Sequence, residues 1–147
     1  MADLRQVFDE LVKYEIELWD AIDARLRAEC DLQLTWFKVM QLLDRLPEAR
    51  VQDIAAEFSI TVGGTSKVVD RLEASGLCRR RPHPHDRRSS VIELTAKGRR
   101  LLGKAAVVVD GELQARLGSV LPERALAQLH RTLTTLRAAG RALDHHR

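Results

Sequence analysis

The sequence predicts a mainly α-helical fold with a small antiparallel β wing, and three observations lead to this prediction. Two helical patterns, at about residues 52–58 and 62–75, are separated by three residues, which is the spacing of a helix-turn-helix. An arginine-rich strand and a returning strand follow at once in a hairpin pattern. Longer helical patterns lie on both sides. The fold class is therefore a winged helix-turn-helix flanked by N- and C-terminal helices.

The flanking helices are predicted from apolar periodicity. From Asp3 to Glu29, apolar residues recur near a 3.6-residue period and form a wide stripe. A helix this long at the end of a small chain has little core of its own to cover. We therefore expect the helices at about 3–29 and 96–143 to pack against a second subunit as dimerisation helices.

Capping signals set the ends of the central elements. Thr35, Thr61 and Thr95 each precede a helical pattern and are suitable N-caps, whereas Gly76 is a suitable stop. Pro122 fits the first turn of the last helix. The expected elements, in chain order, are helices at about 36–46, 52–58 and 62–75, strands at 77–81 and 89–94, and helices at 96–117 and 122–143.

The hairpin carries further signals. Arg50 and Val51 fit one short additional strand. Pro82 and Pro84 are expected to stop strand pairing and to hold the tip open, because proline has no N–H for the ladder. The arginines at 79–81 alternate between the two faces of their strand, so they cannot all face one partner.

Length and composition favour one domain. A chain of 147 residues with 45% apolar residues can bury a core, and we expect a single domain over 1–147 with the winged helix-turn-helix at about 34–95. No apolar run approaches the roughly 20 residues that span a bilayer, and the N-terminus lacks a signal-peptide pattern. Cys30 and Cys78 lie far apart and form no metal or redox motif. A cytoplasmic protein without membrane contact is predicted.

Positive charge is concentrated in one segment. Residues 62–104 hold eleven Lys and Arg against four acids, which is +7, while the remaining 13 bases and 17 acids give −4. This asymmetry indicates a surface that binds a polyanion, although an ordinary solvated surface is the alternative. The sequence contains no nucleotide-binding glycine motif, no catalytic set at a recognisable spacing and no metal-ligand cluster, so no enzyme, cofactor or metal is expected.

Four motifs together resemble the MarR family of bacterial transcription regulators. They are VQDIAAEFSI before the turn, VVDRLEASGLCRR between helix and wing, DRRS at the wing tip and LTAKGRRLL after it. The resemblance covers nearly the whole chain. It implies a homodimer formed by the N- and C-terminal helices, binding to pseudo-palindromic double-stranded promoter DNA, and often release by a small ligand, commonly aromatic. Repression is the most common mode of regulation in the family.

The predicted DNA contacts fall on the helix at about 62–75 and on the wing tip. Lys67 and Arg71 are four residues apart and share a helix face, with Lys67 near base edges and Arg71 near phosphate or an acid of the fold. Arg88 is expected in the minor groove, and Asp86 is expected to orient its guanidinium or to serve as a plain turn residue. The full set is Thr61, Val62, Gly63, Thr65, Ser66, Lys67, Arg71, Asp86, Arg87 and Arg88.

The sequence departs from the family pattern at two places. Ser59 occupies a turn position where the family often has glycine. Gly63 and Gly64 are unusual inside a reading helix, because each glycine costs about 1 kcal/mol of helix propensity relative to alanine. Either these glycines allow close approach to DNA or they are tolerated at exposed positions.

A ligand site is predicted only by the resemblance. Trp19, Trp36, Phe37 and Arg79 are candidates to line it, with use as core aromatics as the alternative. Cys30 has no cationic neighbour in sequence, so an inert thiol is favoured over an oxidant sensor. A protein–protein assembly module is the alternative function. The sequence leaves the operator, the effector and the choice between activation and repression undecided, as well as any sensing by the wing histidines.

Overall fold

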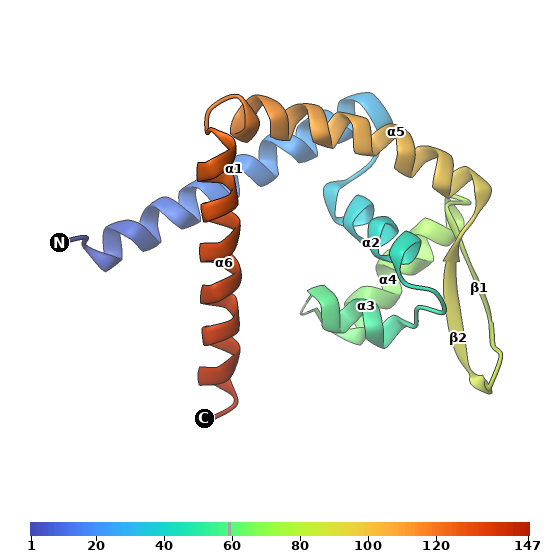
Figure 1. The fold of residues 1–147 in the computed structure, drawn as a ribbon. Coiled ribbons are helices and arrows are strands. Elements are labelled where there is room, and N and C mark those ends of the chain that lie inside the picture. Colours follow the sequence, from blue (N-terminus) through green and yellow to red (C-terminus); the bar gives the residue numbers. More distant parts are fainter. Residues whose placement is uncertain (59) are drawn as a thin grey trace. The chain divides into compact units, whose positions relative to one another are not determined.

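The computed structural model describes residues 1–58 and 60–147, apart from the side chain of Arg87. The expectations about Ser59 and about the Arg87 side chain therefore lie outside the described residues. The elements are α1 (Leu4–Cys30), α2 (Leu34–Arg45), α3 (Val51–Phe58), α4 (Val62–Ala74), β1 (Cys78–His83), β2 (Asp86–Leu94), α5 (Ala96–Leu113), a π-helical turn (Gln114–Gly118) and α6 (Glu123–Asp144). The predicted mainly α fold with a β wing is confirmed (Figure 1).

The chain divides into two compact units, residues 1–109 and 110–147, which we describe separately. The prediction of one domain stays a prediction. In the first unit, the buried side chains of α2, α3 and α4 meet those of the wing. The fully buried ones include Met40, Ile54, Leu72 and Ile92. These residues form the core that holds α4 and the wing together.

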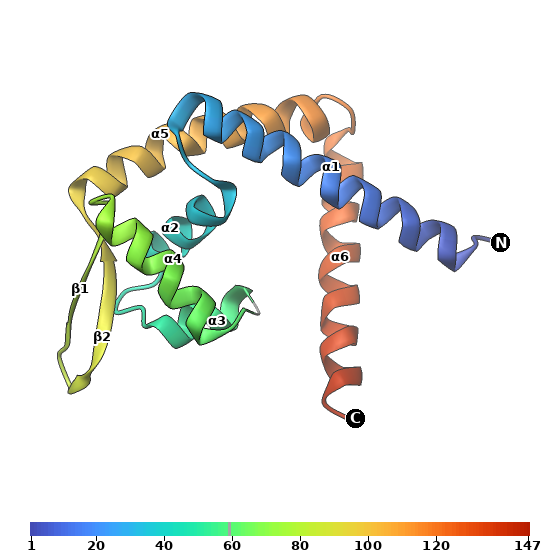
Figure 2. The ribbon, with the colours of Figure 1, turned by 180° about the vertical axis from the view of Figure 1, so that it is seen from behind.

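The wing is an antiparallel pair in which Cys78 pairs with Leu94 and Arg80 with Ile92. It extends away from the helices of its unit in both views (Figures 1 and 2). Pro82 remains in register opposite Ser90, so the expectation that pairing stops before the prolines was wrong. A two-stranded sheet leaves an outer edge on each strand, where a missing N–H costs no ladder bond.

A single bridge residue replaces the short strand expected at residues 50–51. Ala49 pairs with Ile92, whose N–H donates to the Ala49 carbonyl at 2.7 Å. Val51 already begins α3, and the N–H of Arg50 donates to the carboxylate of Asp53 at 2.9 Å. Val51, which was predicted to lie in a strand, is therefore the first residue of α3.

The start of α2 also differs from the prediction. The helix begins at Leu34, and its N-cap position is Gln33, not Thr35. The carboxylate of Asp23 in α1 accepts a hydrogen bond from the Leu34 N–H at 2.8 Å. A side chain distant in sequence thus satisfies a free N–H of the first turn, which no local capping rule identifies. Burial opposes ionisation of Asp23, but this bond and Arg27 hold its pKa below the usual value.

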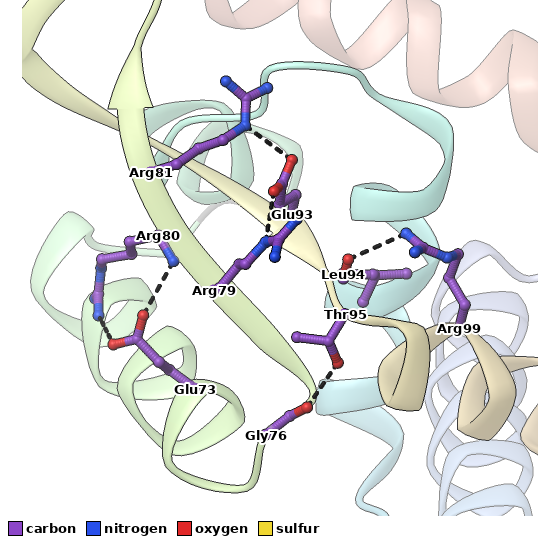
Figure 3. A network of polar contacts seen from close by, with 9 residues as sticks. All are labelled: Glu73, Gly76, Arg79, Arg80, Arg81, Glu93, Leu94, Thr95 and Arg99. Carbon is purple, nitrogen blue, oxygen red and sulfur yellow. Dashed lines mark hydrogen bonds and ion pairs between the residues drawn. The ribbon is translucent and has the colours of Figure 1, made fainter.

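The junction between α4, the wing and α5 is built as the capping signals predicted. Gly76 has φ of 74°, as expected for a glycine that ends a helix. The Thr95 hydroxyl accepts from the Gly98 N–H at 3.0 Å. It also donates to the Gly76 carbonyl at 2.6 Å (Figure 3). A Cβ on Gly98 would lie 2.0 Å from the Leu77 carbonyl oxygen, so α5 begins in direct contact with the backbone after α4.

Both ends of the chain carry exposed apolar faces. The buried residues of α1 are confined to its C-terminal half, and the N-terminal half projects away from α2–α4 (Figure 2). In the second unit, α6 has no buried residue at all. It starts one residue after Pro122, which occupies the N-cap position and not the first turn. No helix in the described part of the chain is long and apolar enough to cross a membrane.

Candidate nucleic-acid interface

The second helix of the motif, α4, presents a cationic outer face. The Thr61 side chain caps it by accepting from the Gly64 N–H at 3.0 Å, as predicted. Lys67 and Arg71 are exposed, one turn apart. Val69 and Leu72 lie on the opposite face and are fully buried. The sequence therefore separated the inner and outer faces of α4 correctly at these positions.

The assignment of Thr65 to the outer face of α4 was wrong. Its side chain was expected on the outer face, but it is fully buried. Its hydroxyl donates to the Thr61 carbonyl at 2.9 Å, which is one turn back along the helix. Threonine can bury its methyl group while its hydroxyl bonds to the backbone in this way, so it fits the core face as well as the outer one.

The strand arginines are bound to acids of the chain (Figure 3). Arg79 and Arg81 lie on one face of β1 and both donate to Glu93 of β2, at 2.7 and 2.8 Å. Arg80 points to the other face, where it contacts Asp70 at 2.7 Å and Glu73 at 3.0 Å on α4. The predicted alternation is confirmed. The acids that receive these arginines were not predicted as part of the site.

These contacts have a clear electrostatic signature. Hydrogen bonds from Arg81 and Arg79 hold the pKa of Glu93 below its usual value. Partial burial disfavours the charge on Arg80, but Asp70 and Glu73 outweigh it and raise the pKa of Arg80. Glu73 also accepts from the Arg80 backbone N–H at 3.0 Å. The Glu73 carboxylate therefore binds both the backbone and the guanidinium of Arg80. Arg80 therefore joins the wing to α4.

At the wing tip, Asp86 shapes the backbone. Its carboxylate accepts from the Arg88 backbone N–H at 3.0 Å and from the Ser89 hydroxyl at 3.2 Å. These two bonds lower the pKa of Asp86. Among the described residues, Asp86 makes no ion pair with the guanidinium of Arg88. The expected orientation of the Arg88 side chain by Asp86 is corrected to the turn role that the sequence left open.

On the described part of α4 and the wing, three cations have no acid partner. They are Lys67 and Arg71 on α4 and Arg88 at the wing tip, and all three are exposed. Within the same part, no group of three or more His, Cys, Asp or Glu could hold a metal ion. The exposed face of α4 and the wing tip are therefore the cationic candidates for binding an anionic partner.

Comparison with known proteins agrees with this arrangement. Residues 32–90 match the model of the MarR family. CouR, a transcriptional repressor bound to a 23-mer DNA duplex, is 27% identical with a TM-score of 0.82, and the match covers 93% of this chain and 99% of CouR. Residues 32–90 are thus similar to the MarR family.

Further solved structures share this fold. CouR from Rhodococcus jostii RHA1 bound to p-coumaroyl-CoA is 25% identical, with a TM-score of 0.80 over 88% of this chain and 90% of that one. Sco3205, a MarR family regulator from Streptomyces coelicolor in complex with DNA, has a TM-score of 0.86 at 21% identity over 95% and 89% of the two chains.

A curated relative gives the same family at the sequence level. The uncharacterized HTH-type transcriptional regulator YfiV of Bacillus subtilis is 34% identical over 71 residues, or 48% of this chain. The match spans 44% of the length of YfiV, and a similar match to YkoM of the same organism spans 46% of that protein. The chain therefore spans under half the length of these two relatives. Both relatives are described as HTH-type transcriptional regulators.

The aromatic candidates for a ligand site have separate surroundings. Phe37 is buried in the core of the first unit. Trp19 is 39% exposed and borders a shallow cavity of about 220 Å³ with Glu15 and Ile16. Arg79 is bound to Glu93, and Trp36 is half-buried. The described contacts do not bring these four residues together, and their role in a ligand site stays a prediction.

Both cysteines of the chain are free and buried. Burial, and secondly the charge of Glu73, raises the pKa of the Cys78 thiol to about 11. Its sulfur lies 3.8 Å from the Val69 carbonyl oxygen. Because the thiolate is the reactive form, Cys78 is an inert packing residue, as predicted.

Proposed function

We propose that this protein is a homodimeric, sequence-specific DNA-binding transcription regulator. The observation that carries the proposal is the position of the three unpaired cations, Lys67 and Arg71 on α4 and Arg88 at the wing tip. The second helix of a helix-turn-helix fits the major groove, and an arginine at a hairpin tip fits a narrow minor groove. One subunit thereby contacts two grooves of the same duplex.

The residues divide into base readers and phosphate binders. The first turns of α4 enter the major groove with Thr61, Val62, Gly63, Ser66 and Lys67. The first turns carry the base contacts because the N-terminal residues of a recognition helix meet the base edges. Arg71 lies further along the helix and binds phosphate, as does Arg87 beside the wing tip. Phosphate contacts position the protein, and base contacts give specificity.

The dimer is supported by the exposed apolar faces at both ends of the chain. Phe8 in α1 is 64% exposed, and Leu136 in α6 is 57% exposed. Leu129, Leu133, Leu136 and Leu143 recur at helical spacing along one face of α6. A helix gains most of its stability from packing such a face, so α6 needs a partner surface. A second copy of the chain supplies it and places two reading helices about 10 base pairs apart.

A binding experiment tests the DNA part of the proposal. The protein is used to select sequences from a random duplex pool, and affinity is then measured by fluorescence anisotropy at several salt concentrations. Lys67→Ala should cost about 1–3 kcal/mol at a selected sequence. The matched control is Arg124→Ala, which removes an exposed cation of α6 and should leave the affinity unchanged. Equal affinity of Lys67→Ala and the original protein would contradict base readout by α4.

Light scattering tests the dimer independently of DNA. Leu136→Asp places a charge in the apolar face of α6 and should convert the dimer to a monomer. Ala138→Asp introduces the same side chain two residues later, on the opposite and exposed face of the helix, and should leave the mass unchanged. A monomeric mass for the unaltered chain would refute the homodimer.

We further propose that the regulator is a repressor released by a small aromatic ligand. CouR supports this part, because it is described as a repressor and is seen with p-coumaroyl-CoA. Sequencing the DNA bound in the native genome identifies the promoters, and a reporter fused to one of them should gain activity when the gene is deleted. A panel of phenolic acids and their CoA thioesters should release the DNA in vitro. Reporter activity that falls on deletion would make the protein an activator.

A further inference from the structure

The first turn of α4 contains a position that the fold itself leaves empty. Gly63 and Lys67 are one turn apart on the outer face, whereas the buried Thr65, Val69 and Leu72 occupy the inner face. A Cβ built on Gly63 would meet no protein atom within 4 Å. The packing of the described chain therefore gives no reason for a glycine at this position.

The neighbouring glycine behaves differently. A Cβ on Gly64 would lie 3.1 Å from the Oγ1 atom of Thr61, which is the atom that caps the helix. Gly64 thus makes room for the cap. Neither Gly63 nor Gly64 has a positive φ, so backbone conformation does not require glycine at either position. The cost of about 1 kcal/mol for glycine in a helix is explained by the cap at Gly64 and unexplained at Gly63.

An exposed apolar side chain stands beside the empty position. Val62, the first residue of α4, is 56% exposed, and Ile60 just before the helix is 40% exposed. Both lie close in sequence to Lys67, at the end of α4 that enters the groove under the proposed function. The apolar group on base edges in the major groove is the 5-methyl group of thymine. An exposed valine next to a glycine offers that methyl group a contact surface and the space to reach it.

We infer that Val62 and Gly63 recognise the 5-methyl group of a thymine in each half-site. Val62 supplies the apolar contact, and Gly63 leaves the space that any larger side chain would fill. The inference rests on the proposed DNA-binding function and adds the base that the start of α4 selects. It also assigns the glycine pair two separate tasks, with Gly64 serving the cap and Gly63 serving the DNA.

Deoxyuridine provides an atomic test, because it differs from thymidine only by the missing methyl group. Each thymine of a duplex selected from a random pool is replaced in turn, and affinity is measured by anisotropy. One thymine per half-site should show a loss of about fourfold, which is the effect of one buried methylene-sized group. Replacement at the other thymines should leave the affinity within about twofold, because they make no such contact.

Protein variants then locate the contact. With Val62→Ala, the affinity ratio between thymine and deoxyuridine at that position should fall to near one. Gly63→Ala should bind the thymine duplex more weakly, while its unfolding midpoint rises by about 2–4 °C from better helix propensity. The matched control is Gly103→Ala in α5, where a Cβ also meets nothing within 4 Å. It should be stabilised in the same way without a change in DNA affinity.

The outcomes separate this inference from the function on which it rests. If no sequence is enriched from the pool, the proposed function fails. If a sequence is enriched but no thymine is sensitive to deoxyuridine, the methyl readout is wrong and the regulator stands. The readout is also overturned if Val62→Ala keeps the full thymine preference, or if Gly63→Ala binds the selected duplex as tightly as Gly103→Ala.

Discussion

Two groups of cations on the winged helix differ in what they contact. The arginines of β1 are all bound to acids of the same chain, at distances of 2.7 to 3.0 Å. Lys67, Arg71 and Arg88 have no acid partner among the described residues. The two groups lie within one basic segment of the sequence, but the first is engaged in the fold and the second is free for a ligand. Charge counted along a sequence therefore overstates the charge that a surface offers.

The difference arises from strand register and from the helix beside the wing. Arg79 lies directly opposite Glu93 in the ladder, and Arg81 lies diagonally from it on the same face. Arg80 points the other way, toward Asp70 and Glu73 of α4. At the tip, the carboxylate of Asp86 bonds to a backbone N–H and to a hydroxyl, and it does not pair with the Arg88 guanidinium.

The comparison is tested most strongly by removing one arginine from each group. Arg88→Ala should weaken binding to a selected duplex by about 1–3 kcal/mol, and it should reduce the salt dependence, because an unpaired cation is lost. Arg79→Ala should have a much smaller effect, because Glu93 already neutralises Arg79. Anisotropy titrations across salt measure both. Equal losses for the two variants would show that pairing within the chain does not decide which arginine binds DNA.

The second test removes the acid partner of two strand arginines and leaves the arginines themselves unchanged. Glu93→Gln removes the shared acid of Arg79 and Arg81, and affinity for random-sequence DNA should rise. The slope of log affinity against log salt should steepen by up to about 1 for each arginine that then reaches a phosphate. Glu57→Gln, which frees Arg45 of α2, is the control. An unchanged slope for Glu93→Gln would mean that orientation, not pairing, keeps these arginines from DNA.

The third test concerns stability. Arg80 is 28% exposed at its side chain and contacts two acids, so Arg80→Met should lower the free energy of unfolding by about 1 kcal/mol. Arg45→Met breaks a 3.4 Å pair whose side chains are 69% and 50% exposed, and its effect should be near zero. Urea unfolding of both variants gives the comparison. A larger loss for Arg45→Met would contradict the structural role given to Arg80.

The smallest effect is expected from pH. The folded pKa of Glu93 is lowered by Arg81 and Arg79, from an ordinary value of 4.5. The stability from this carboxylate is therefore present above the ordinary pKa and is lost as pH falls through the lowered one. The stability difference between the original protein and Glu93→Gln should shrink over that acidic range in urea titrations. A difference that stays constant down to the lowest pH would mean that ionised Glu93 does not stabilise the fold.

Sequence reasoning was most successful where the signal is local. Thr61 and Thr95 cap their helices as predicted, and Gly76 ends α4 with a positive φ. The buried faces of the helices follow apolar periodicity, because burial repeats with the helical turn. Local rules failed where a distant group competes with a near one. The helix α2 begins before Thr35, because Asp23 in α1 satisfies the first N–H from another helix.

The sequence by itself determined the fold class, the resemblance to the MarR family and the presence of a basic segment, because apolar periodicity, capping residues and short motifs are readable along the chain. Only the tertiary structure decided which of those charges are available. The Thr65 side chain is buried, and the three arginines of β1 are each paired with an acid. Gly63 faces open space, whereas Gly64 lies against the capping oxygen of Thr61. These outcomes depend on contacts between side chains of different helices and strands. Strand register and helix packing determine those contacts, and neither is encoded in a local sequence pattern.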